Sequence, residues 1–211
     1  MAQSAAIPLG FITSWEGLVD RAGVHAGHKV LIHGGAGGVG YLAVQLAVAR
    51  GAEVFATGSP RSQDVIRHIG ATAVDYTAST VDEYVNQHTG GDGFDVVVDN
   101  VGGATLDASF TAVKRYTGHV VSALGWGSHS LAPLSFRGAT YSGVFTLMPL
   151  LTGYGREHHG QMVAEAAVLA ESGRLVPRMH STTFTLDDVE TAYATVESGS
   201  ATGRVVVLPN G

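Results

Sequence analysis

The sequence predicts an α/β protein with a doubly wound parallel sheet of six strands, in the order 3-2-1-4-5-6, and helices on both faces. Short apolar runs alternate with segments of helical periodicity through the first two thirds of the 211 residues, which is typical of parallel sheets covered on both sides. Five glycines also lie within seven residues directly after the first apolar run. Doubly wound sheets that bind nucleotides carry a glycine-rich turn at this place.

The six strands are predicted from their length and apolar content, because strands buried on both faces read as continuous apolar runs. They cover residues 29–33, 53–57, 72–76, 94–100, 118–124 and 139–147. The intervening segments predict helices at residues 39–50, 62–70, 79–88 and 103–114. Gly70 suits the end of the second helix, and Ser79 or Thr80 suits the N-cap of the third.

A different rhythm follows Leu150. The pattern predicts a long helix, an extended stretch, a second helix and a last strand, at residues 156–173, 174–184, 185–199 and 203–209. Thr185 can cap the second of these helices, and Asp187 and Asp188 place negative charge in its first turn, where the helix dipole favours it.

Composition excludes several classes of protein. With 45% hydrophobic and 14% charged residues, the chain can bury a core and is unlike a disordered one. Its net charge of −6 disfavours nucleic-acid binding, which requires a basic face. The absence of Cys excludes disulfides and Cys-based zinc sites. Without a signal-peptide pattern or a run long enough to span a membrane, we expect a soluble, cytoplasmic protein.

Gly35, Gly37 and Gly40 form the pattern G-x-G-x-x-G between a predicted strand and a predicted helix. In this context the first glycine permits a tight turn, the second lets the backbone approach a diphosphate, and the third lets the helix pack closely on the strand. The helix N-terminus then offers free N–H groups to the phosphates. The pattern therefore predicts a Rossmann-type dinucleotide site; a glycine-rich turn without a ligand is the alternative.

The second strand indicates which dinucleotide binds. An acidic residue about 20 positions after the glycines would hold the 2′-hydroxyl of NAD, but Glu53 opens the strand and lies too early. The strand ends instead in small polar groups and a cation that suit a 2′-phosphate, and a tyrosine after the third strand can cover the adenine side: Thr57, Gly58, Ser59, Arg61 and Tyr76. We therefore predict NADP(H), with a solvated Arg61 as the alternative.

Several segments, in order along the whole chain, resemble the medium-chain dehydrogenase/reductase superfamily. They read AAIPLGFITSWEGLVDRAGVHAGHKVLIHGGAGGVG, GATAVDY, FDVVVDNVGG, GHVVSALG and ESGSATGRVVVLP. Within the superfamily the chain is similar to quinone oxidoreductases and to alcohol dehydrogenase-like proteins that do not depend on zinc. The resemblance implies NADP-linked hydride transfer to or from a carbonyl, an enone or a quinone.

The resemblance also implies roles for individual residues. The diphosphate would lie on Ala36, Gly37, Gly38 and Val39, and Asn100 would lie by the nicotinamide ribose. The nicotinamide would be lined or approached by Thr13, Leu124, Gly125, Phe145, Thr146 and Leu147, and Arg204 would reach the cofactor from the last strand. No catalytic residue is assigned. For Phe145 and Leu147, ordinary core or loop positions are an equal alternative.

In the family, a β-rich domain of on the order of a hundred residues precedes this region and carries most of the substrate pocket. We therefore expect a truncated chain with a linking helix at residues 1–22, a Rossmann NADP-binding domain at 23–173, and a segment at 174–211 that would complete the absent catalytic domain. We expect little turnover from it alone. The alternative function is a stand-alone module that binds or senses NADPH without turnover.

Other sites and folds are less consistent with the sequence. The ten His show no convergent zinc pattern: His25 and His28 lie in a glycine-rich turn, and His158 and His159 are adjacent on a helix. No Tyr is followed by Lys four residues later, as short-chain reductases require, and no G-x-S-x-G nucleophile motif occurs. A methyltransferase, the best competitor on fold alone, would use an acidic residue at the end of the second strand.

The sixth strand predicts a homodimer. Residues Ala139 to Met148 are apolar and fall at the sheet edge in the order 3-2-1-4-5-6. A bare apolar edge strand invites pairing with another chain, and relatives of this family commonly pair there. An edge covered by the chain's own helix at residues 156–172 is the alternative.

Overall fold

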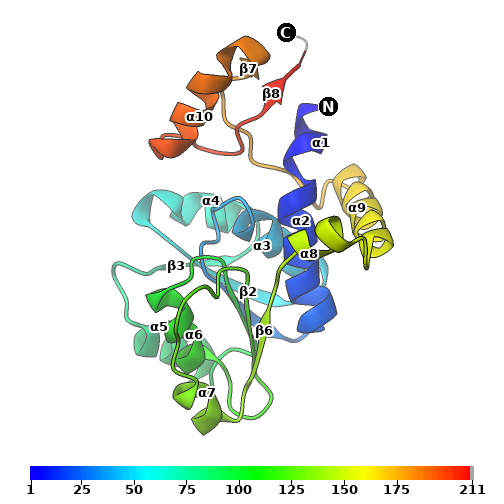
Figure 1. Ribbon diagram of the computed structural model, residues 1–211. Helices are drawn as coiled ribbons and strands as arrows, with labels where there is room; N and C mark the ends of the chain where they lie inside the picture. Colours follow the sequence, from blue (N-terminus) through cyan, green and yellow to red (C-terminus); the bar gives the residue numbers. More distant parts are fainter. Residues whose placement is uncertain (210–211) are drawn as a thin grey trace.

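A computed structural model, described here for residues 1–209, confirms the predicted sheet. Its six strands are all parallel and lie in the order 3-2-1-4-5-6 (Figure 1). The strands are β1 (Lys29–Ile32), β2 (Glu53–Gly58), β3 (Thr72–Asp75), β4 (Val96–Asp99), β5 (His119–Ser122) and β6 (Thr140–Gly143).

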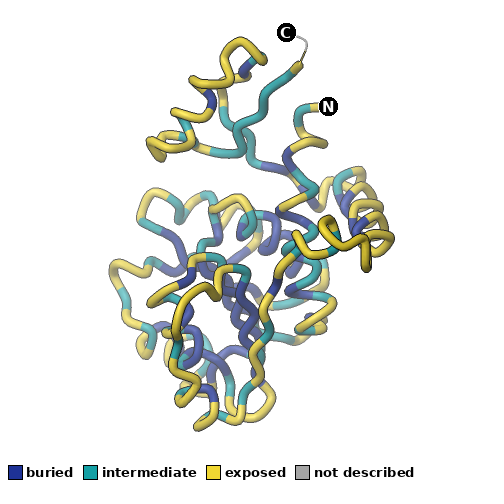
Figure 2. Tube along the Cα trace, viewed as in Figure 1, coloured by how far each residue is buried: buried dark blue, intermediate teal, exposed yellow. Residues whose placement is uncertain are grey.

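Helices cover both faces of this sheet, because successive side chains of a strand point to opposite faces. Val30 and Ile32 face the side covered by α2 (Pro8–Trp15), α3 (Gly40–Ala49), α4 (Gln63–His68) and α9 (Arg156–Glu171). Leu31 faces the side covered by α5 (Val81–Thr89), α6 (Ala104–Ala112) and α7 (Ala132–Arg137). The sheet between these layers is the most deeply buried part of the chain (Figure 2).

The N-terminal and C-terminal parts of the chain lie next to each other at one end of the molecule. The N-terminal part comprises α1 (Ala2–Ala6), α2 and a π-helical turn at Glu16–Arg21. The C-terminal part comprises β7 (Phe184–Thr185), a 3₁₀ turn at Leu186–Asp188, α10 (Val189–Glu197) and β8 (Val207–Leu208), with β7 and β8 paired in parallel. This small unit lies above the main sheet, next to the N-terminus (Figure 1). None of the helices within residues 1–209 is long and apolar enough to cross a membrane.

Two of these elements begin with capping residues that the sequence indicates. Thr80 accepts a hydrogen bond from the Glu83 N–H, and Glu83 Oε2 accepts one from the Thr80 N–H at 2.8 Å. Thr80 rather than Ser79 is therefore the N-cap of α5. Thr185 makes the equivalent pair with Asp188, but the first turn that follows is 3₁₀, and α10 begins only at Val189.

Most strands are shorter than the sequence predicts, and the sixth and the last differ most. The sixth strand ends at Gly143 rather than residue 147, and α8 (Leu147–Thr152) follows it. A short apolar run cannot be assigned to helix or strand by periodicity alone, and this run contains no polar residue between Leu147 and Leu151. The last strand is reduced to Val207–Leu208, with a separate bridge between Arg204 and Met179. Helix α7, within a Gly- and Ser-rich stretch, was not predicted.

Candidate nucleotide-binding site

The glycine-rich loop joins β1 to α3 and leaves several N–H groups unpaired. The Gly35 N–H donates to Thr57 O at 2.9 Å, and the Gly37 N–H donates to Gly34 O at 2.9 Å. The N–H groups of Ala36, Gly38 and Val39 have no acceptor among residues 1–209. Free N–H groups at the start of a helix, together with the helix dipole, form a site for an anion.

The glycines of the loop are required by close approaches. A Cβ at Gly35 would lie 2.6 Å from Ala56 Cβ, and one at Gly40 would overlap the Gly34 carbonyl. Gly37 and Gly38 are exposed on the loop surface. A Cβ at Gly37 would have the Gly34 oxygen, 3.2 Å away, as its one close neighbour in the described chain. The loop is therefore open at Gly37, where a side chain would fill the space that a diphosphate requires, whereas Gly38 lies against the Arg204 guanidinium group.

A cavity of about 1320 Å³ runs from this loop across the carboxyl ends of β1 to β4. Ligands of open α/β sheets bind at this end of the strands. Ten of the predicted site residues line the cavity: Ala36, Gly37, Gly38, Val39, Thr57, Gly58, Ser59, Tyr76, Asn100 and Arg204. Gly35 is the buried residue of the loop and lies against Ala56, and Arg61 is next in sequence to Ser62, which lines the cavity.

The other predicted residues lie outside this cavity and form pairs beside β5 and β6. Thr13 Oγ1 lies 3.5 Å from Thr146 Oγ1. The Leu124 N–H donates to Ser122 Oγ at 3.1 Å, and Phe145 packs edge-on against Trp126 with ring centroids 5.7 Å apart. Gly125 follows Leu124 in the loop after β5, and Leu147 is the first residue of α8. Their assignment to the nicotinamide end stays a prediction.

Asp99, at the end of β4, holds the loop that forms one wall of the cavity. Its carboxylate is fully buried. It accepts hydrogen bonds from Ser122 Oγ at 2.7 Å, the Gly102 N–H at 2.9 Å and the Val101 N–H at 3.1 Å. These bonds tie β4 to β5 and present Asn100 to the cavity, where Asn100 Nδ2 donates to His33 O at 3.1 Å.

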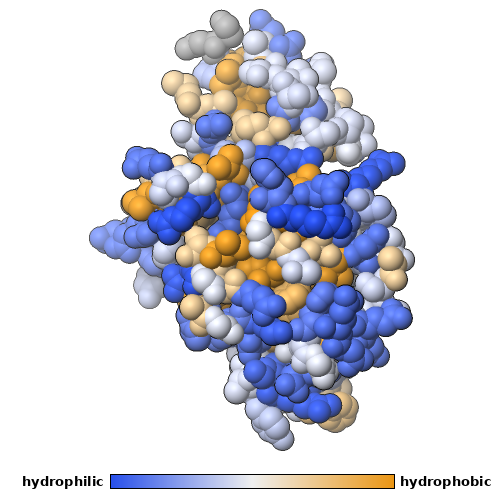
Figure 3. All heavy atoms as spheres, turned by 180° about the vertical axis from the view of Figure 1, so that it is seen from behind, coloured by the Kyte–Doolittle hydropathy of each residue, from blue (hydrophilic) through white to orange (hydrophobic). Residues whose placement is uncertain are grey.

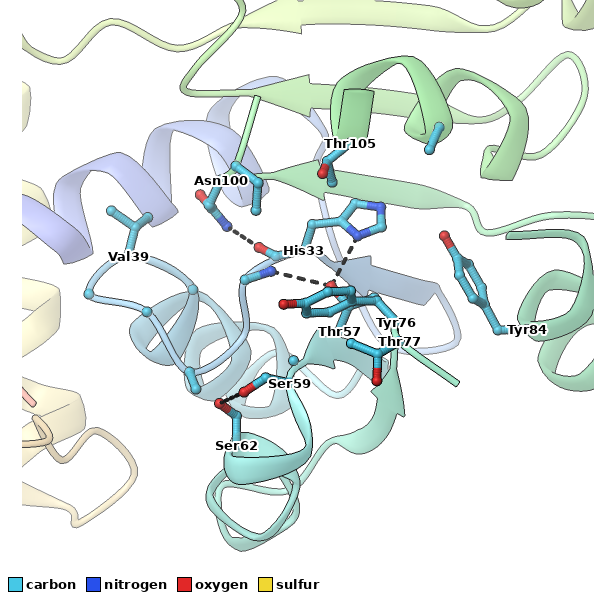
Figure 4. A pocket seen from close by; sticks show the side chains of 18 of the residues that line it. His33, Val39, Thr57, Ser59, Ser62, Tyr76, Thr77, Tyr84, Asn100 and Thr105 are labelled. Atoms are coloured by element: carbon cyan, nitrogen blue, oxygen red, sulfur yellow. Dashed lines mark hydrogen bonds between the residues drawn. The ribbon is translucent and has the colours of Figure 1, made fainter. Parts of the chain in front are cut away.

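His33, directly after β1, is a buried polar side chain that the sequence did not indicate as part of the site. Its Nδ1 lies 3.1 Å from Thr57 Oγ1, and its Nε2 has no partner within residues 1–209 (Figure 4). Burial lowers the pKa of His33 to about 4, and the Asp99 charge opposes this shift. At neutral pH the imidazole is therefore uncharged.

The depressed pKa of His33 predicts a loss of stability in acid. The unfolded chain binds a proton at this His below pH 6.5, whereas the folded chain does so only near pH 4. The free energy of unfolding should therefore fall by about 3 kcal/mol between these pH values on account of His33. The His33→Asn variant can keep the hydrogen bond to Thr57 but has no imidazole to protonate. Its free energy of unfolding, measured by urea titration at pH 7, 5.5 and 4.5, should therefore fall less with decreasing pH than that of wild type. Parallel pH profiles for both proteins would contradict this account.

Other residues that line the cavity were not predicted from the sequence, for two different reasons. Thr77, Ala78, Ser79, Thr80, Val81, Glu83 and Tyr84 line the cavity from the turn after β3 and from α5. Their place follows from the position of β3 beside β2, so the predicted strand order contained the signal. Burial raises the pKa of Tyr84 to about 12, so Tyr84 is a neutral hydroxyl group. Arg178 and Ala201, from the C-terminal segment, carry no local signal in the sequence.

Arg204 contacts the glycine loop, and its predicted contact with the cofactor stays a prediction. Its Nη2 donates to Gly38 O at 3.3 Å. A Cβ at Gly38 would lie 2.8 Å from the same nitrogen, so the guanidinium group lies directly against this glycine. The contact brings a positive charge to the open face of the loop.

Comparison with known proteins places the chain in a family. The zinc-binding dehydrogenase family matches residues 69–207. An alcohol dehydrogenase superfamily protein from Novosphingobium aromaticivorans has a similar structure, with a TM-score of 0.95 and 50% identity over 98% of this chain and 63% of that one.

Two curated relatives differ greatly in size. The spectinabilin polyketide synthase system protein NorB of Streptomyces orinoci is 41% identical over 83% of this chain and 8% of its own length. The 2-methylene-furan-3-one reductase of Solanum lycopersicum is 34% identical over 99% of this chain and 47% of its own length. The chain thus spans less than half of either curated relative.

The family name implies zinc, and the side chains present do not fit it. Zinc needs three or four convergent ligands. Within residues 1–209, no three His, Cys, Asp or Glu side chains converge as a metal site. The unpaired N–H groups and the open glycine loop, in contrast, fit a nicotinamide dinucleotide. The chain belongs to the zinc-binding dehydrogenase family of the medium-chain dehydrogenase/reductase superfamily, and it carries the Rossmann cofactor-binding domain of these oxidoreductases.

Proposed function

We propose that this chain is the cofactor-binding part of an NADP(H)-dependent reductase. The observation that carries the proposal is the exposed glycine loop at the start of α3, whose unpaired N–H groups open into a cavity of about 1320 Å³. The loop would hold the diphosphate, and Asn100 would lie by the nicotinamide ribose. The cofactor, when bound, supplies the hydride that reduces the substrate. The chain's own contribution is to bind and orient the cofactor.

The charges of the cavity favour NADP(H) over NAD(H). Among the described residues that line the cavity, one is acidic, Glu83. Its carboxylate accepts hydrogen bonds from the Thr80 N–H and hydroxyl group. At the end of β2, where an acidic residue would bind the 2′-hydroxyl of NAD, Ser59 Oγ lies 3.2 Å from Ser62 Oγ. Arg61 lies between these two serines in sequence and is exposed to solvent.

Arg61→Ala should weaken NADPH binding and leave NADH binding almost unchanged. A hydrogen bond to a charged group contributes about 1.5–3 kcal/mol, so the affinity for NADPH should fall roughly tenfold or more. Fluorescence titrations of wild type and variant with both cofactors measure this. Arg67→Ala, which removes an exposed arginine paired with Asp64 on α4, is the matched control. Equal losses with NADPH and NADH would show that Arg61 acts elsewhere.

For the substrate, we propose a compound with a C=C bond conjugated to a carbonyl, such as an enone or a quinone, with simple carbonyl compounds as the alternative. The support is the relative named 2-methylene-furan-3-one reductase, since that name describes such a conjugated system. An assay of NADPH oxidation with an enal, an enone and a quinone tests the class. Because we expect little turnover from this chain alone, the discriminating result is a positive one: turnover of any of the three would rule out the alternative, a module that binds or senses NADPH without turnover.

We also propose that two copies of the chain pair through β6. Helix α9 packs on α2, and Thr140, Tyr141 and Gly143 of β6 are exposed. Four exposed apolar side chains follow in α8: Leu147, Met148, Leu150 and Leu151. Figure 3 shows the opposite face from Figure 1: there, hydrophobic residues gather in the middle of the molecule and in part of its upper end, and the lower part is mostly hydrophilic.

Gly143→Pro should convert the dimer to a monomer. The N–H groups of Thr140 and Val144 donate to β5, to Gly118 O at 3.0 Å and Ser122 O at 2.9 Å. By the alternation of a strand, the Gly143 N–H points away from β5, so proline there removes an outward donor and leaves the β5–β6 pairing intact. Light scattering measures the mass, and NADPH titration checks the fold. A variant that stays dimeric, or a monomeric wild type, would contradict the proposal.

A further inference from the structure

Two arginines of the C-terminal segment bring positive charge to the glycine-loop end of the cavity. The charged residues that line it, within the described chain, are Glu83, Arg178 and Arg204. Glu83 belongs to α5 and is held by Thr80. Both arginines also line a second cavity of about 320 Å³, together with Ala36, Gly37 and Gly38. The two cavities therefore meet at this loop, with the arginines at their junction.

The backbone fixes the two arginines relative to each other. The Arg204 N–H donates to Arg178 O at 2.7 Å, and the His180 N–H donates to Arg204 O at 3.0 Å. Together with the bridge between Met179 and Arg204, these bonds hold residues 178–180 alongside residue 204. Because Arg204 lies against Gly38, the same pairing brings Arg178 to the loop.

Neither guanidinium group has an anionic partner in the part of the chain that the structure describes. No carboxylate lies within ion-pair distance of either. Arg204 donates to Gly38 O, and the Arg178 side chain makes no hydrogen bond within residues 1–209. Both side chains are half-buried. A guanidinium group has five N–H donors, and leaving them partly desolvated without an acceptor costs free energy. This arrangement suits an anionic ligand.

We propose that Arg178 is a second diphosphate-binding residue, which acts with Arg204 on the phosphates opposite the N–H groups of the glycine loop. This inference rests on the proposed function. In this arrangement the diphosphate is bound from two sides. The N–H groups at the start of α3 contact it on one side, and the guanidinium groups of Arg178 and Arg204 contact it on the other. Planar guanidinium groups match phosphate oxygens in a bidentate geometry.

The test compares Arg178→Gln with Arg174→Gln. Arg174 belongs to the same segment, is exposed and donates to Ser172 Oγ, so its replacement changes the net charge equally without touching the cavity. We expect Arg178→Gln to lower NADPH affinity about tenfold to a hundredfold and Arg174→Gln to leave it unchanged. Arg178→Lys should keep part of the affinity, because the charge remains.

A second ligand separates diphosphate binding from other effects. Adenosine 2′-monophosphate carries the adenosine and the 2′-phosphate but no diphosphate, so its affinity should be the same for wild type and Arg178→Gln. The fall of NADPH affinity with added salt should also be less steep in that variant, since one charge contact is missing.

The outcomes that overturn the proposal are distinct. Unchanged NADPH affinity in Arg178→Gln, or an equal loss for both ligands, would overturn the role of Arg178 and leave the proposed function standing. A wild-type chain that does not bind NADPH would overturn both.

Discussion

Gly37→Val should abolish measurable NADPH binding while the domain stays folded. The valine side chain would stand on the exposed face of the loop, where the diphosphate must approach the N–H groups of Gly38 and Val39. The loss of two hydrogen bonds to charged phosphates, at about 1.5–3 kcal/mol each, lowers the affinity by more than about a hundredfold. NADPH fluorescence measures the binding, and circular dichroism measures the fold.

The fold should survive because a Cβ at Gly37 has one close neighbour in the described chain, the Gly34 oxygen at 3.2 Å. Gly160→Val is the matched control: this glycine lies exposed on α9, and a Cβ there meets nothing within 4 Å. The control should bind NADPH like wild type. A folded Gly37→Val protein with unchanged affinity would show that the cofactor does not lie on this loop.

Asp99→Ala should cost about 3 kcal/mol or more of the free energy of unfolding. The fully buried carboxylate accepts three hydrogen bonds, from Ser122 Oγ and from the N–H groups of Val101 and Gly102. Each contributes about 1.5–3 kcal/mol, and their removal leaves buried donors unpaired. Because domains are stable by only about 5–15 kcal/mol, urea denaturation should show a large shift of the midpoint.

Asp99→Asn separates the hydrogen bonds from the side-chain volume. The Asn amide oxygen can still accept from Gly102, and its NH₂ group can donate to Ser122 Oγ, so we expect a smaller loss than for Asp99→Ala. A similar loss for both variants would show that charge, rather than the number of hydrogen bonds, stabilises this corner. Urea midpoints that match wild type in both variants would show that the network contributes little.

The fold class follows from the sequence because the strands are short, apolar and separated by well-bounded helices. The glycines after β1, and Thr80 with Glu83 at the start of α5, are local signals whose structural meaning depends on few other residues. The run from Ala139 to Leu151 was harder to interpret. It contains β6, a turn and α8, and whether an apolar run continues as a strand or begins a helix depends on tertiary packing.

The site was predictable where it lies at strand ends that the glycine pattern identifies, such as Gly37, Ser59 and Asn100. His33 was missed because a single His after a strand has no periodic signal, and its burial depends on packing from other elements. Arg178 was missed because it comes from a segment that follows no regular pattern. It reaches the loop through two long-range backbone hydrogen bonds.

The most direct test of the central claim is a map of amide chemical shifts on titration with NADPH. Binding in the proposed place should shift the amide resonances of residues 34–40, 57–59, 76–80 and 100–105, and those near Arg178 and Arg204. The resonances of α7 and α10 should stay unchanged. Saturable shifts confined to these four loops and to the residues around Arg178 and Arg204 are the result we predict. Shifts that avoid the glycine loop, or no saturable shifts at millimolar NADPH, would contradict the assignment of this chain as a dinucleotide-binding domain.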